Sequence, residues 1–309
     1  MDVKAKEPSP KAEWTGRAVI EHLAEIYQQL YLRPGPAGEA AYKDIVNRGK
    51  DAEIRDLSHF RSHQMDRCDH EMTPAGPIMV ITLHERADFE LFLQIIAHRC
   101  VPFAVPATQG ASIIDGVVNW QRIRAHKAGF LLAQRLAGDL DPDWAAEFRR
   151  FTADKANYKD ALIVLSCGPY SNLPTSKVNL DEQAWLEASM TIRRVHECTH
   201  FICRRMYPDQ IDAVWDELVA DAAGIYAAFG HFDLPLAELC LGVTAEGFTE
   251  GRLRNYADES ALDELARRIH TVFTAFDAIL KALGDVSPFD AALALEEQKP
   301  LLWDGGKAE

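Results

Sequence analysis

Hydrophobic positions recur at steps of three and four residues in several parts of the chain, the spacing that places them on one face of an α-helix. The first such stretch ends at Pro34-Gly35-Pro36, where proline and glycine interrupt helical hydrogen bonding. The pattern predicts helices over about 14–32, 40–67, 89–96, 182–206, 208–229, 234–241, 258–284 and 287–297.

Three short apolar runs are typical of β-strands, at 78–83, 101–105 and 161–167. The helix expected between the first two makes 78–105 a compact β-α-β unit. Few strands followed by a run of helices predict an α+β protein, with a small N-terminal α/β portion and a mainly helical C-terminal half.

The chain divides by composition into a leader and two larger portions. Residues 1–13 contain Lys, Glu, Pro and Ser with little to bury, which predicts a disordered leader. We expect an α/β portion of unknown role over 14–175 and a helical portion over 176–309. Since no linker marks the boundary near 175, a single domain is also possible.

Charge and apolar content limit the classes of protein that the chain can represent. With 48% hydrophobic residues, its 309 residues can bury a core. The 47 acidic against 33 basic residues give a net charge of −14, which opposes binding to nucleic acid or anionic membranes. Without a signal segment or an apolar run of about 18 residues, we expect a cytoplasmic protein. Its six cysteines form no C-x-x-C pair and should be reduced thiols.

One segment carries recognisable chemistry, the His-Glu-x-x-His sequence that begins at His196. Helical residues four apart share a face, so His196 and His200 can present two imidazoles to one metal ion, with Glu197 beside them. A catalytic zinc site also needs a third protein ligand. The next helix offers Glu217 and, one turn on, Asp221, which could bind the metal and hydrogen-bond a ligand imidazole respectively.

His-Glu-x-x-His followed by Glu-x-x-Ala-Asp resembles the gluzincin zinc metallopeptidases, in particular the minigluzincin-like peptidases. The resemblance covers about residues 182–229. It implies a Zn²⁺-dependent hydrolase of peptide or protein substrates. By position it implies zinc ligands at His196, His200 and Glu217, a general base at Glu197, and a carboxylate at Asp221 that orients a ligand histidine.

The sequence departs from the gluzincin pattern in two places. Only sixteen residues separate His200 from Glu217, which requires a tight turn near Tyr207-Pro208. Arg193 and Arg194 precede the motif, where such helices usually carry uncharged residues. Arg193 lies near the metal-binding face, so we expect it either to form an ion pair or to anchor a carboxylate of the substrate.

Hydrolysis by this class of site needs a proton acceptor and an oxyanion donor. Glu197 would take the proton from a water that the metal activates. The candidate donors are Tyr226, His231, Arg252 and Tyr256, among which spacing does not choose. Peptide substrates of such enzymes generally add to a sheet edge, for which strand 161–167 is the candidate, although a core strand fits it equally well.

Two other functions remain open from the sequence. An inactive scaffold could bind a protein partner, although a purely structural metal site does not need Glu197. A di-iron carboxylate bundle could use Glu197-x-x-His200, but it requires a second Glu-x-x-His, which the later helices lack. The substrate and the oligomeric state also stay open.

The remaining histidines and Cys198 are weaker candidates. His59-x-x-x-His63 has helical ligand spacing, but we find no convincing acidic partner after it. His70-Glu71 and His84-Glu85 lack a second histidine at ligand spacing. Cys198 points away from both motif histidines on the helix and should be a buried thiol.

Overall fold

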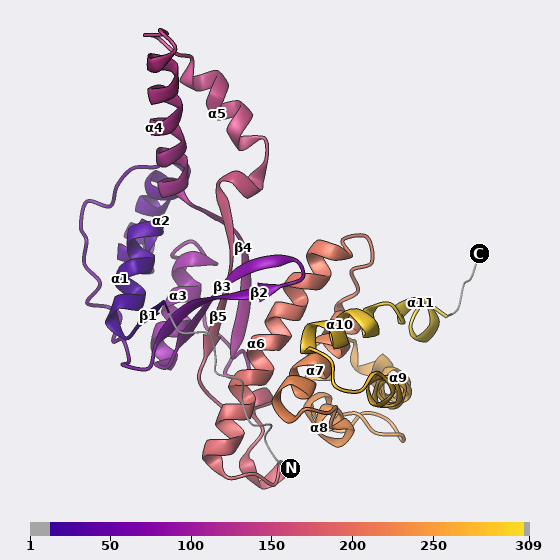
Figure 1. Ribbon diagram of the computed structural model, residues 1–309. Helices are drawn as coiled ribbons and strands as arrows, with labels where there is room; N and C mark the ends of the chain where they lie inside the picture. Colours follow the sequence, from indigo (N-terminus) through magenta and orange to yellow (C-terminus); the bar gives the residue numbers. More distant parts are fainter. Residues whose placement is uncertain (1–12, 306–309) are drawn as a thin grey trace.

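The computed structural model describes residues 13–305, so the expected leader, apart from Glu13, lies outside the described residues. The chain has the predicted α+β fold, with one mixed sheet in the first half and a helical second half (Figure 1). The strands lie in the order β1-β2-β3-β5-β4, and only β3 and β5 are parallel. They are β1 (Trp14–Thr15), β2 (Arg67–Thr73), β3 (Gly76–Leu83), β4 (Ala111–Val118) and β5 (Lys159–Ser166).

Alternating side chains of the central strands pack against different layers. Leu162 and Val164 join the core beneath α1 (Arg17–Ile26), α2 (Pro36–Tyr42) and α3 (Arg86–Ile96). Ile163 and Leu165 point to the opposite face, against α6 (Glu182–Met206). This two-residue alternation is what places a helix layer on each face of the sheet.

Helix α6 lies between the sheet and the other helices of the second half (Figure 1). Phe201 packs against the sheet, whereas Trp185 and Ile192 belong to the core of the helical layer. That layer contains α7 (Ala213–Phe229), α8 (Leu234–Leu241), α9 (Leu262–Leu283), α10 (Pro288–Glu296) and the short α11 (Lys299–Leu302). The sequence therefore predicted α7 to α10 correctly, whereas α11 was not predicted. α7 begins five residues later than expected because 207–212 form the turn.

The prediction of a β-α-β unit over 78–105 is wrong. β3 and α3 are present, but 101–105 forms no strand, and Val101 and Phe103 are exposed. Pro102 and Pro106 each lack the N–H that a ladder needs. The parallel partner of β3 is instead β5, and the intervening β4 went unpredicted because a bulge between Asp115 and Val117 interrupts its pattern.

The prediction of a helix over 40–67 is also wrong, except for its first turns. After α2 the chain makes a π-helical turn, Lys43–Asn47, and Gly49 then adopts a left-handed φ of 67°, which ends the helix. Residues 48–66 are mostly irregular, and β2 follows with a polar sequence that gave no strand signal.

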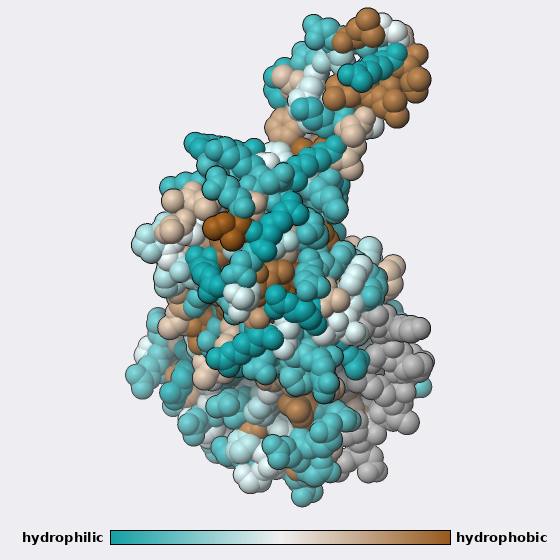
Figure 2. All heavy atoms as spheres, turned by 90° about the vertical axis from the view of Figure 1, so that its left-hand side faces the viewer, coloured by the Kyte–Doolittle hydropathy of each residue, from teal (hydrophilic) through white to brown (hydrophobic). Residues whose placement is uncertain are grey.

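Two helices that the sequence analysis did not predict form an arm that projects from the body (Figure 1). α4 (Trp120–Leu136) and α5 (Trp144–Thr152) connect β4 to β5. Hydrophobic side chains gather at the far end of the arm (Figure 2), where Leu132, Leu136 and Leu140 are exposed. None of the helices within residues 13–305 combines the length and apolar character that crossing a membrane requires. A domain boundary near 175 stays a prediction.

Candidate metal centre

The close crossing of α6 and α7 brings the motif residues together. A Cβ added to Gly224 would lie 2.8 Å from the carbonyl oxygen of Ile192, so only glycine allows this approach. The connection of six residues between the helices makes them run antiparallel. As a result, His200 faces Glu217 and, one turn further on, His196 faces Asp221.

Three side-chain groups converge with the spacing of metal ligands. The Nε2 atoms of His196 and His200 are 3.0 Å apart, and the carboxylate of Glu217 lies 3.5 Å and 3.2 Å from them. Tetrahedral coordination at zinc–ligand distances of 2.0–2.1 Å separates the ligand atoms by about 3.3 Å. Oε2 of Glu217 is buried and has no hydrogen-bond partner within the described chain. The donor set therefore fits a zinc ion.

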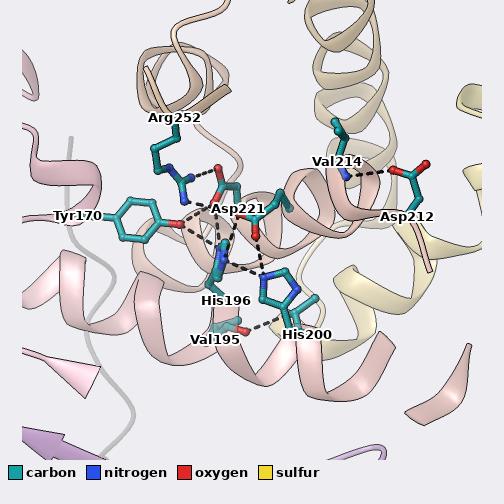
Figure 3. Close-up of polar contacts among 10 residues, drawn as sticks. Tyr170, Val195, His196, His200, Asp212, Val214, Asp221 and Arg252 are labelled. Atoms are coloured by element: carbon teal, nitrogen blue, oxygen red, sulfur yellow. Dashed lines mark hydrogen bonds and ion pairs between the residues drawn. The ribbon is translucent and has the colours of Figure 1, made fainter. Parts of the chain in front are cut away.

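Behind these groups, Asp221 orients one ligand imidazole (Figure 3). The fully buried carboxylate of Asp221 accepts a hydrogen bond from the Tyr170 hydroxyl at 2.5 Å, and the same oxygen lies 2.9 Å from Nδ1 of His196. Arg252 pairs with the other oxygen of Asp221 and lies 3.6 Å from Glu217. A proton held on Nδ1 leaves the Nε2 lone pair of His196 free to bind a cation.

Opposite charges in the site overcome the effect of burial. Burial alone would lower the pKa of His196, but Glu217 and Asp221 raise it above the usual value. Burial would likewise raise the pKa of Glu217, yet the facing imidazoles and Arg252 hold it well below its usual range. The site is thus built to hold positive charge next to two carboxylates.

A cleft of about 460 Å³ opens in front of the candidate ligands. Glu197 lines this cleft, and its carboxylate has no hydrogen bond or ion pair within residues 13–305. The start of β4, which is the edge strand of the sheet, forms one wall. The other lining groups include Tyr170, Ser171, Arg193, Arg204, Arg252, Asn255 and Tyr256.

The four candidate oxyanion donors separate into two pairs. Arg252 and Tyr256 line the cleft, but Arg252 is already bound to the site's carboxylates. Tyr226 and His231 are not among the lining residues. The Tyr226 hydroxyl donates to the carbonyl of Gly284, and Nδ1 of His231 lies 3.2 Å from the carbonyl of Phe229.

The prediction that Arg193 forms an ion pair is wrong. Its guanidinium is buried and donates to the backbone carbonyls of Ser166, Gly168 and Pro169 at 2.5–3.0 Å. Carbonyl groups at the end of β5 satisfy this cation without a carboxylate. Arg193 therefore holds the segment that carries Tyr170. Its role as an anchor for a substrate carboxylate stays a prediction.

Arg194, the other departure from the gluzincin pattern, pairs with Asp69 and Glu71 of β2. The ion pairs let a charged residue of α6 lie against the sheet.

Tyr170 is a residue of the site that the sequence pattern does not indicate. It lies in a 3₁₀ turn, Tyr170–Asn172, in which Ser171 and Asn172 have positive φ angles of 51° and 57°. No sequence spacing relates this turn to α6 or α7. In the structure, the Tyr170 amide donates to the Ser189 hydroxyl, and Arg193 donates to the carbonyl of Pro169, the residue before the turn.

Together, the mixed sheet, the buried helix pair and the His-His-Glu cluster define an α+β protein with a candidate metal centre in a cleft. The chain belongs to a family of unknown function (DUF7005), which matches residues 11–299. No curated protein and no solved structure matches the chain.

Proposed function

We propose that this protein is a zinc metallopeptidase with His196, His200 and Glu217 as the zinc ligands. The observation that carries the proposal is the convergence of these three groups beside Glu197, whose carboxylate lines the cleft and has no hydrogen bond or ion pair with residues 13–305. A zinc ion held there would lower the pKa of a neighbouring water to about 7 and polarise a substrate carbonyl.

The chain's own groups supply the proton transfers. Glu197 accepts a proton from the attacking water and passes it to the leaving amine as the peptide bond breaks. Asp221 keeps the proton of His196 on Nδ1 throughout. The phenol of Tyr256 is the proposed donor to the developing oxyanion. Burial and the nearby Glu217 raise the pKa of Tyr256, which keeps that proton in place at neutral pH.

The proposed substrate is a peptide or a protein segment in extended conformation. β5 pairs with strands on both sides, so the expectation that 161–167 is the substrate edge is wrong. β4 has a free edge, and Gly110, Ser112 and Ile113 line the cleft. An extended chain added there would bring one carbonyl to the metal ligands. We propose that the protein is cytoplasmic and that it binds neither nucleic acid nor membranes.

The di-iron alternative lacks support of this kind. Such centres use several carboxylates from a helical bundle. The other group of possible metal ligands among residues 13–305 contains one carboxylate and lies outside the helical layer.

Hydrolysis of a peptide library, followed by mass spectrometry, tests the proposed activity. The wild-type protein should cleave a subset of peptides, lose this activity on chelation and regain it with zinc. Glu197→Gln should retain the fold and lower turnover by about 10²–10⁴-fold, because the variant lacks the proton acceptor. Glu187→Gln, at an exposed position of the same helix, is the matched control. An unchanged rate for Glu197→Gln would exclude the proposed mechanism, and no cleavage by the wild type would favour a scaffold.

A further inference from the structure

A second cluster of potential metal ligands lies on the sheet, away from α7. His63 and Asp66 belong to a turn that is closed by a hydrogen bond from the Asp66 amide to the His63 carbonyl. His84 directly follows β3. One ligand atom from each of His63, Asp66 and His84 lies within 4.8 Å of the other two. From the sequence, His63 lacks a convincing acidic partner after it, and His84 lacks a second histidine at ligand spacing, because the partners come from different segments.

Asp66 holds the cluster together and carries a charge that needs compensation. Its fully buried carboxylate accepts backbone N–H bonds from His63 and from His84, both at 2.8 Å. Within residues 13–305, its ion-pair partner is a histidine, His84, rather than a lysine or arginine. A buried carboxylate requires a neighbouring cation, which here is either a proton on His84 or a metal ion.

The geometry of His84 suits a shared metal ion better than a shared proton. Its Nδ1 atom is buried without a hydrogen-bond partner and lies 3.6 Å from Oδ1 of Asp66. This separation is too long for an N–H···O bond but close to the distance of about 3.3 Å between two ligands of one tetrahedral zinc. The ring of His63 stacks near that of His84, with centroids 5.2 Å apart.

Cys167 is the candidate for a fourth ligand, and its Sγ atom lies outside the group of ligand atoms that fall within 4.8 Å of one another. Leu83 and Ser166 pair in the parallel register of β3 and β5, so His84 and Cys167 are the next residues at the same end of neighbouring strands. The amide of Cys167 donates to the carbonyl of Leu83 at 3.4 Å, which places Cys167 beside His84 at the ends of the two strands. Structural zinc sites are typically four-coordinate, with nitrogen and sulfur ligands.

We propose that His63, Asp66, His84 and Cys167 bind a second, structural zinc ion. This ion joins the 63–66 turn to the ends of β3 and β5. The chain continues from Cys167 to the segment that Arg193 holds and that carries Tyr170. The second site therefore stabilises the fold on the approach to the candidate catalytic centre, without taking part in its chemistry.

Zinc content measured by mass spectrometry tests this proposal independently of any peptidase activity. The wild-type chain should hold two zinc ions. A His196→Ala/His200→Ala double variant should hold one, as should His84→Ala. His70→Ala, an exposed histidine on β2, is the control that should keep two. A His196→Ala/His200→Ala variant that holds no zinc, or a second ion that His84→Ala and His63→Ala both retain, would overturn the second site. One ion per wild-type chain that the double variant keeps and His84→Ala loses would instead count against the first site.

Cobalt substitution in the double variant tests the ligands even if His84→Ala fails to fold. Co²⁺ should produce a thiolate-to-metal charge-transfer band that Cys167→Ser abolishes. Chelation should lower the melting temperature of the double variant, and zinc should restore it. A Co²⁺ spectrum without this band would exclude Cys167, and a melting temperature insensitive to chelation would exclude the structural role.

Discussion

At the scale of single residues, the candidate centre depends on Asp221. Its fully buried carboxylate accepts a hydrogen bond from Tyr170 and forms ion pairs with His196 and Arg252. Each of these partners comes from a different element, so the position of one imidazole is determined by three parts of the chain. A carboxylate in this position would act on a metal at the candidate centre by orienting His196.

Replacing Asp221 with asparagine should weaken zinc binding at the candidate centre by about 10–100-fold. The amide has no negative charge to stabilise the Nδ1 proton of His196, although it keeps a similar shape. Competition with a zinc chelator measures the affinity. Asp258→Asn, at an exposed position, is the control and should bind like the wild type. Equal zinc affinities of the two variants would show that Asp221 does not orient a ligand.

At the scale of elements, the centre depends on how closely α6 and α7 approach. Gly224 leaves no room for a Cβ beside the backbone of Ile192, and this close approach sets the distance between the faces that carry the candidate ligands. Helical spacing in the sequence predicts which residues share each face, but it does not predict the distance between the two faces.

Gly224→Ala should destabilise the protein by about 1–3 kcal/mol, because its new methyl group would lie 2.8 Å from the Ile192 carbonyl oxygen. Gly129→Ala in α4 is the matched control, since no atom lies within 4 Å of its added Cβ. That variant should be as stable as the wild type or more stable by up to about 1 kcal/mol. Urea denaturation measures both, and a Gly224→Ala protein as stable as the control would contradict the close crossing.

The elements also show which features could be predicted from the sequence. His196, Glu197, His200, Glu217 and Asp221 were found because regular helical spacing converts sequence positions into shared faces. Tyr170 and the His63, Asp66 and His84 cluster were missed because turns and strand ends have no such period. The strand expected over 101–105 had the right apolar composition, but Pro102 within it and Pro106 directly after it lack the N–H that a ladder needs.

At the scale of the whole molecule, a firmly packed body contrasts with a thinly packed arm. Thirteen residues of α6 are buried, whereas Ile123 is the one buried residue of α4 and Glu147 the one of α5. Glu147 is held by His126 and Arg150 within the arm itself. The arm therefore contributes little to the common core (Figure 2).

Hydrogen exchange should be much faster in the arm, residues 124–152, than in residues 192–203 of α6. Few buried contacts mean that the arm can open without unfolding the body. Mass spectrometry of peptic fragments gives the rates for both segments. Equal protection of the arm and α6 would contradict this expectation and would mean that something covers the exposed leucines.

The most direct test of the central claim compares the zinc content of three variants with that of the wild type. His196→Ala and Glu217→Ala should each lose one zinc ion per chain, since each removes a ligand of the candidate centre. Glu197→Gln should lose none, because Glu197 lines the cleft without belonging to the ligand set. Full zinc retention by both ligand variants would contradict the account of this site.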